Sequence, residues 1–192
     1  MKTKSPIHAT VYTALMAAVC FVLTLIYVPL GESRVHFGNA GSLLSGLILG
    51  PWLGGLASGI GAFLFDLTHG YGIVEALITF VSKFLMAMAA GLVAGTYRRE
   101  GNLLNKSGNL RMVLGCVVGG LTYICLYMLK TYIKQRFVAG VPLDGTWAVM
   151  LAKLPATAIN NGFAAVVSPI LYTALRPALN AIGVLKQLRP DK

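Results

Sequence analysis

The region 35–92 is almost entirely apolar, yet a lysine, Lys83, lies deep within it. A charge inside an apolar membrane span is expensive, so it usually serves a purpose. Glycines recur at helical spacing in the same region, and the segment Gly-Pro-Trp-Leu-Gly-Gly at 50–55 is typical of a tight turn. The region therefore predicts short membrane-spanning helices that pack closely, with a functional charge between them.

The composition supports a membrane protein. Of the 192 residues, 56% are hydrophobic and 11% are charged, whereas soluble domains carry about a quarter charged residues. The net charge of +10 would suggest nucleic-acid binding in a soluble protein. Here the basic residues gather between the apolar segments, as in cytoplasmic loops, and no aromatic and basic RNA-binding pattern is present. We expect contact with membrane lipid and no nucleic-acid partner.

The apolar segments predict an all-α integral membrane protein with six transmembrane helices in a single domain, 1–192. The first run is long enough to span a membrane and has no cleavage motif after it, so we expect it to be retained. The second and third segments are short against the roughly 20 residues that a straight span needs, which leaves open one broken span in their place. The predicted spans are 8–28, 39–49, 53–67, 73–97, 110–132 and 147–175.

The distribution of basic residues favours six spans with both termini in the cytoplasm, because positive residues accumulate on the inner side. Five spans give nine basic residues against five, so the charge count alone favours six only weakly. With six spans, four basic residues fall outside: Arg34, Lys130, Lys134 and Arg136. Ten fall inside: Lys2, Lys4, Arg98, Arg99, Lys106, Arg111, Arg176, Lys186, Arg189 and Lys192.

Motifs for catalysis or metal binding are missing from the sequence. It has no GxxxxGK[ST] phosphate loop, HExxH or GxSxG. The histidines are not paired: His8, His36 and His69. The cysteines lie inside apolar spans without metal-ligand spacing: Cys20, Cys116 and Cys125. We therefore predict no catalytic residue, metal or cofactor, and a protein that is not an enzyme.

Polar residues inside the spans are the candidate substrate contacts. Lys83 needs a polar partner, and Glu75, eight residues earlier on the same face, is too far away to pair with it directly. Asn160 and Asn161 point about 100° apart on a helix, so at most one should face a shared cavity. Tyr123 and Tyr127 share a helical face on which a flat ring could stack. A structural ion pair, polar contacts between helices and interfacial aromatics are the alternative interpretations.

Small residues in the first span allow another helix to approach closely. Ala14 and Ala18 are four residues apart, with Ala17 beside them, and this spacing favours helix contacts in lipid. The contact could be internal packing or docking to a second protein.

A glycine-rich hairpin, the motif D-L-x-x-G-Y at 66–71 and a lysine in the next span together resemble the S components of energy-coupling factor (ECF) transporters. The nearest branch is riboflavin-type or hydroxymethylpyrimidine/pyridoxine-type. The resemblance implies a multi-pass protein of the prokaryotic plasma membrane that docks through Ala14, Ala17 and Ala18. The implied partners are an ECF transmembrane subunit and two ABC-type ATPase subunits. The family often has an acidic residue where this chain has Asn39, so a ligand contact by that carboxylate is not expected here.

The resemblance also implies that outer loops 31–37, 66–72 and 138–146 gate a cavity between the later spans. The expected function is binding of a water-soluble vitamin or precursor for ATP-driven uptake, with hydroxymethylpyrimidine or pyridoxine first and riboflavin as the alternative. A membrane-embedded enzyme or a small channel is the rival class, although no polar pore stripe is present. The expected substrate contacts are Lys83, Asn160, Asn161, Tyr123, Tyr127, Glu75, His36 and Tyr71.

Overall fold

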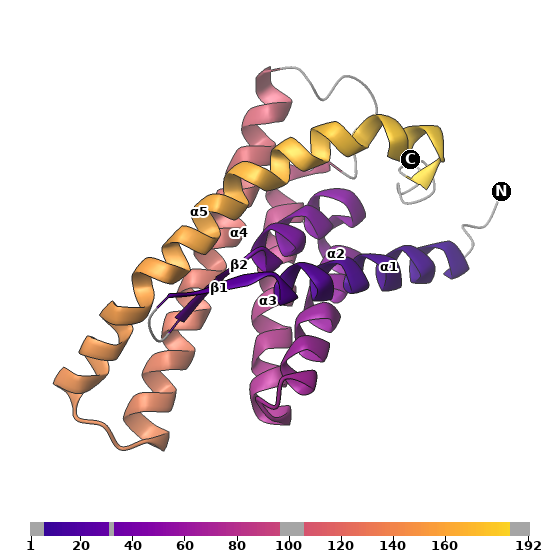
Figure 1. The fold of residues 1–192 in the computed structure, drawn as a ribbon. Helices are drawn as coiled ribbons and strands as arrows, with labels where there is room; N and C mark the ends of the chain where they lie inside the picture. The colour runs from indigo at the N-terminus through magenta and orange to yellow at the C-terminus, as the bar shows by residue number, and fades with distance from the viewer. Residues whose placement is uncertain (1–5, 31–32, 97–105, 185–192) are drawn as a thin grey trace.

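The computed structural model describes residues 6–30, 33–96 and 106–184, and within them five helices are long and apolar enough to cross a membrane (Figure 1). A two-stranded hairpin and a π-helical turn complete the fold. In chain order the elements are α1 (Pro6–Leu25), β1 (Tyr27–Leu30), β2 (Ser33–His36), α2 (Gly38–Thr68), α3 (Ile73–Ala94), α4 (Lys106–Ile133), η2 (Lys134–Val138) and α5 (Leu143–Ala181).

The helical membrane fold agrees with the sequence prediction, but the number of helices differs. The predicted spans 39–49 and 53–67 both fall within α2, so the described residues hold five long helices in place of six. Six spans and cytoplasmic termini stay predictions. Many basic residues of the charge count lie outside the described residues: Lys2, Lys4, Arg98, Arg99, Lys186, Arg189 and Lys192.

A sharp bend divides α2 where the sequence predicts a turn. Gly50 has φ 82° and ψ −176°, which is not helical and which side chains other than glycine rarely adopt. The hydroxyl of Ser45 donates to the carbonyl oxygen of Gly54 at 2.9 Å. Nine residues of continuous helix would cover about 13.5 Å, so the chain folds back on itself between these residues. The predicted turn is therefore present, between two helical segments in contact.

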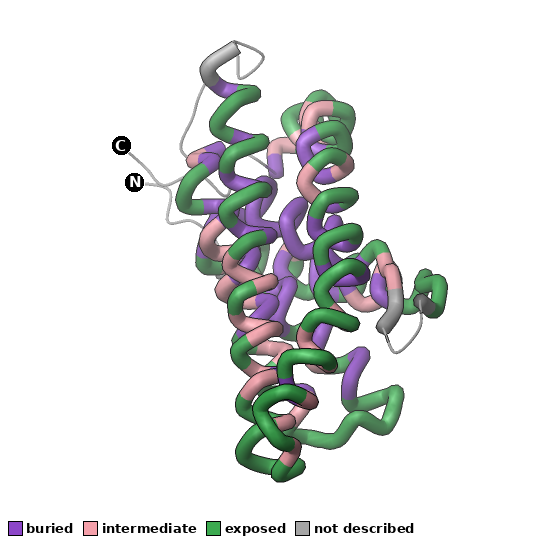
Figure 2. Tube along the Cα trace, turned by 90° about the vertical axis from the view of Figure 1, so that its left-hand side faces the viewer, coloured by how far each residue is buried: buried purple, intermediate pink, exposed green. Residues whose placement is uncertain are grey.

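The folded-back α2 is the centre of the molecule. In its most apolar segment, 67% of the residues are buried, against 22–39% in the other long helices. Figure 2 shows the buried residues gathered in the middle of the molecule and the exposed residues on the outer faces of the helices. The core residues Leu43, Leu47 and Met86 are fully buried. The exposed outer faces carry many large apolar side chains, as expected for helices that face lipid.

Glycines allow α2 to approach its neighbours closely. A Cβ added at Gly46 would lie 2.2 Å from the backbone oxygen of Ala87 on α3. A Cβ at Gly61 would lie 2.5 Å from the backbone oxygen of Ala17 on α1. Such contacts are typical of small residues between membrane helices, and they fix the position of α2 between α1 and α3.

Gly46→Ala is expected to destabilise the protein by about 1–3 kcal/mol, because the backbone of Ala87 cannot move aside without shifting a helix. Gly162→Ala is the matched control. Gly162 lies inside α5 with nothing within 4 Å of an added Cβ, so alanine there should be neutral or stabilise by up to about 1 kcal/mol. Thermal unfolding of the purified variants in detergent measures both. Equal unfolding temperatures for the two variants would contradict this packing.

The β-hairpin formed by β1 and β2 was not predicted, and it corrects the predicted end of the first span. The sequence prediction continued that helix to residue 28, but α1 ends at Leu25 and Tyr27 starts β1. The strands pair antiparallel, with Tyr27 opposite His36 and Val28 opposite Val35. Each strand has only four residues, and β1 contains a proline, so the pattern is too short to distinguish from the end of a helix. The hairpin extends from α1 towards α5 (Figure 1).

Candidate functional site

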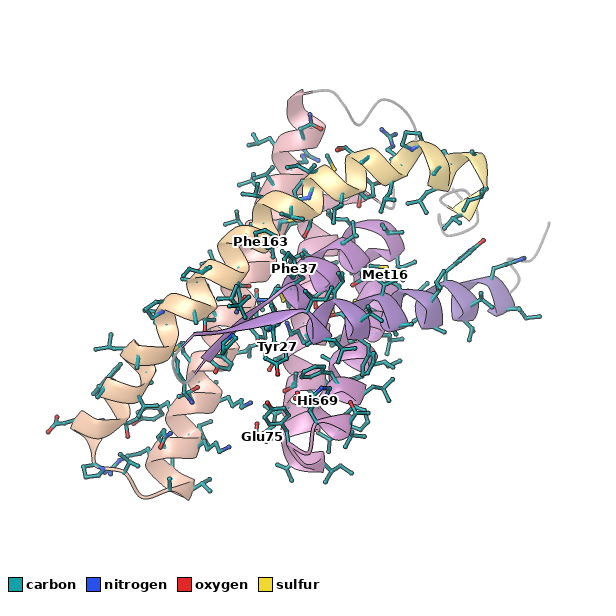
Figure 3. All side chains as sticks on the ribbon, viewed as in Figure 1. Met16, Tyr27, Phe37, His69, Glu75 and Phe163 are labelled. Atoms are coloured by element: carbon teal, nitrogen blue, oxygen red, sulfur yellow. The ribbon has the colours of Figure 1, made fainter. Side chains whose placement is uncertain are left out.

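A cavity of about 520 Å³ lies between the hairpin and the helices. Residues of all five long helices, both strands and η2 line it. Figure 3 labels two lining residues, Tyr27 from β1 and Glu75 from the start of α3. The volume falls within the roughly 300–1,000 Å³ of pockets for drug-sized ligands. The cavity is thus a suitable size for one small molecule.

Lys83 lies on the cavity wall with a side chain that is only 3% exposed. Its ammonium donates to Oδ1 of Asn39 on α2 and lies 4.3 Å from the ring centroid of Tyr123 on α4. The amide and the aromatic face both compensate a buried cation. Both of these groups are neutral, so neither of them cancels the positive charge of Lys83.

Asn39 connects Lys83 to α5. Its Nδ2 donates to Oδ1 of Asn161 at 3.1 Å, and Asn161 in turn donates from Nδ2 to the backbone oxygen of Thr157 at 2.8 Å. The two asparagines are 0% and 4% exposed. This hydrogen-bond chain fixes the orientation of the Asn39 amide, which presents its oxygen to the ammonium. Asn39 thus acts as a positioning residue for Lys83.

Asn160 binds the hairpin. Its Oδ1 accepts a hydrogen bond from the backbone N–H of His36 at 2.8 Å, and the His36 ring accepts one from the N–H of Gly38 at 3.1 Å. Phe37 packs edge-on against Phe163, with ring centroids 5.1 Å apart (Figure 3). These contacts hold the hairpin against α5 over the cavity.

Glu75 joins α3 to α4 at the end of the cavity. Its carboxylate oxygens lie 2.6 Å from the ammonium groups of Lys130 and Lys134. Glu75 is therefore committed to these two lysines, in agreement with the expectation that it does not pair directly with Lys83.

Tyr123 and Tyr127 form the aromatic wall. Their rings are stacked, with centroids 6.0 Å apart and planes inclined by 22°. Both line the cavity, as does the half-exposed Tyr71. The aligned rings offer a surface on which a flat heterocycle can stack.

Seven of the eight predicted substrate contacts line this one cavity, and Asn161 does not. It supports Asn39 behind the wall, which agrees with the expectation that at most one of the two adjacent asparagines faces the cavity. Sequence reasoning missed several polar lining residues, and for most of them only their place near predicted span ends was available as a signal. The lining residues not predicted as contacts include Thr24, Tyr27, Asp66, Ser82, Thr131, Lys153 and Thr157.

The three alanines of α1 do not share one environment. Ala14 and Ala18 are exposed, whereas Ala17 is 3% exposed and its backbone contacts Gly61 of α2. The expectation that all three belong to one docking face is therefore corrected for Ala17, which takes part in internal packing. Helical rotation explains the difference, because neighbouring positions point about 100° apart.

Asn39→Leu is expected to destabilise the protein by about 1–3 kcal/mol, because the buried ammonium of Lys83 loses an acceptor. Asn180→Leu is the control, since Asn180 is exposed on α5 and should change stability by less than about 0.5 kcal/mol. Thermal unfolding in detergent compares the two. If both variants unfold at the wild-type temperature, Asn39 does not stabilise the lysine.

Comparisons with known proteins point to one family. The family model for the ECF-type riboflavin transporter, S component, matches residues 4–177. A solved structure titled as the S component of a bacterial ECF transporter superposes with a TM-score of 0.60 at 19% identity. It covers 91% of this chain and 99% of its own. An uncharacterized protein in the gap 3′ region of Pyrococcus woesei is 29% identical over 112 residues, 58% of this chain and 68% of that protein.

Proposed function

Because this chain belongs to the ECF-type riboflavin transporter S component family, the membrane substrate-binding subunits for vitamin uptake, we propose that its cavity captures one water-soluble vitamin. The family and the structural neighbour are transporter components, not enzymes. The single observation that supports the site is the meeting of Lys83, Asn160 and the two stacked tyrosines around one cavity.

The ligand that fits these groups has a flat heteroaromatic ring with hydrogen-bond acceptors. The ring would stack on Tyr123 and Tyr127, and an acceptor would meet the ammonium of Lys83. Hydroxymethylpyrimidine and pyridoxine satisfy these requirements with one ring. Riboflavin satisfies them with three rings, and both the family description and the 520 Å³ volume favour it over a single ring. Riboflavin is therefore the first ligand to test.

Transport would require partners. We propose an ECF transmembrane subunit and two ABC-type ATPase subunits, with Ala14 and Ala18 on the docking face of α1. Both alanines are exposed, so a second helix could approach them closely. The sequence has no phosphate loop, and the purified chain should bind vitamin without hydrolysing ATP.

Isothermal titration calorimetry of the purified, detergent-solubilised chain tests the proposal. Riboflavin, hydroxymethylpyrimidine and pyridoxine are titrated separately into protein freed of copurified ligand. One of the three should bind with one-to-one stoichiometry, and ATPase activity should be at background. Absence of binding by all three, or ATP hydrolysis by the contaminant-free chain, would contradict the proposal.

A further inference from the structure

Positive charge exceeds negative charge on the cavity wall. Four lysines and two carboxylates line it, which gives a formal charge of 4 − 2 = +2 with histidine neutral. The lining charges are Lys83, Lys130, Lys134, Lys153, Glu75 and Asp66.

The excess is not cancelled locally. Glu75 lies between Lys130 and Lys134, so this trio retains one positive charge. The contacts of Lys83 with Asn39 and Tyr123 are with neutral groups, which do not cancel its charge. Three positive charges therefore remain, one each on Lys83, the trio and Lys153, against the single negative charge of Asp66.

Lys153 differs from the other three lysines of the cavity wall because its ammonium has no ion pair or hydrogen bond to any residue within 6–30, 33–96 and 106–184. Asp66 on α2 is 7% exposed, and its carboxylate likewise forms no ion pair in the described part of the chain. The ammonium of Lys153 and the carboxylate of Asp66 therefore form no ion pair with each other, and Lys153 can donate to a ligand.

Lys153 lies near the Glu75 end of the cavity. Helices α4 and α5 run antiparallel on either side of the turn near Gly140 (Figure 1). Lys130 lies ten residues before Gly140 and Lys153 thirteen residues after it, while Tyr123 and Asn160 lie seventeen and twenty residues away. Tyr127 lies thirteen residues before Gly140, so Lys153 is at about its level and roughly one helical turn from Lys130. Tyr123 and Asn160 lie farther in.

We infer that the ligand of this cavity carries a negatively charged substituent, a phosphate or a carboxylate, which Lys153 binds. This inference rests on the proposed function and names the substrate class more closely. The ring would lie on Tyr123 and Tyr127. The anionic substituent would extend to Lys153, beside the trio of Lys130, Lys134 and Glu75, whose net charge is positive. An anion in this position gives Lys153 a charge-assisted partner and reduces the excess charge of a partly buried site.

A phospholipid headgroup offers the same phosphate chemistry as a phosphorylated vitamin. The two sources differ in their response to membrane composition. A lipid anion would compete with the ligand's phosphate only when anionic lipid is present, whereas the neutral lipid phosphatidylcholine supplies no net negative charge.

The test measures dissociation constants in nanodiscs of pure phosphatidylcholine for two matched pairs, riboflavin with riboflavin 5′-phosphate and pyridoxine with pyridoxine 5′-phosphate. For the vitamin that binds, the phosphorylated form should bind at least about tenfold more tightly, the effect of one charge-assisted hydrogen bond. Lys153→Met should abolish this ratio. Arg136→Met is the control, since Arg136 is exposed outside the cavity wall and the ratio should persist.

Each other outcome has a defined meaning. If a neutral vitamin binds and its phosphorylated form does not bind more tightly, the inference is wrong and the proposed function stands. If no member of either pair and no hydroxymethylpyrimidine binds, the proposed function itself fails. A ratio that survives in Lys153→Met removes Lys153 as the anion contact. A ratio that disappears when phosphatidylglycerol is added assigns the anion site to lipid and overturns the inference.

Discussion

Replacing Lys83 by methionine is expected to weaken vitamin binding by about 1.5–3 kcal/mol, or at least about tenfold in dissociation constant. Methionine has a similar length and lacks the charge, so the ligand loses a charged hydrogen-bond donor while the cavity keeps its shape. Lys83 is 3% exposed on the cavity wall, beside Tyr123. Calorimetry with the cognate vitamin measures the change.

Arg111→Met is the control for this substitution. Arg111 is exposed and does not line the cavity, so its loss should leave the dissociation constant unchanged. The alternative role of Lys83 is structural, through its bond to Asn39. A Lys83→Met protein that binds vitamin normally once purified but unfolds at a lower temperature than the wild type would establish that role and remove Lys83 from the binding site.

Replacing Ala14 or Ala18 by tryptophan is expected to abolish assembly with the ECF transmembrane subunit and its two ATPases. A large side chain on an exposed small-residue face holds two helices apart and removes their packing contacts. Copurification of the partner subunits with the tagged chain measures assembly. Vitamin binding by the isolated variants should stay near the wild-type value, because neither alanine lines the cavity.

Ala158→Trp provides the matched control, since Ala158 is exposed on α5 and away from the cavity wall. It should assemble normally. Ala17→Trp should instead reduce stability, because Ala17 is buried against α2. Normal copurification of the partners with both Ala14→Trp and Ala18→Trp would show that docking uses another face.

Features that depend on local spacing could be predicted from the sequence. The Gly50 turn was predicted from consecutive turn residues, and the shared face of Tyr123 and Tyr127 from their separation of four. The importance of Lys83 followed from the cost of a charge in an apolar span. These inferences require only the neighbouring residues and the periodicity of a helix.

Features that depend on distant contacts could not be predicted in the same way. Asn39 meets Lys83 across 44 residues of sequence, and Glu75 meets Lys134 across 59 residues. Ala17 differs from Ala14 only because one face of α1 packs on α2, and a small-residue pattern does not specify which face that is. The place of Lys153 on the cavity wall likewise depends on the arrangement of all the helices.

The central claim is that the cavity beside Lys83 is the site of vitamin capture. Native mass spectrometry of the chain, purified from cells supplied with the vitamin, tests this most directly. The wild-type protein should carry one vitamin-sized molecule per chain, and Lys83→Met, purified in parallel and folded, should carry much less. A folded wild-type chain with no bound small molecule, or equal occupancy in folded Lys83→Met, would contradict the claim.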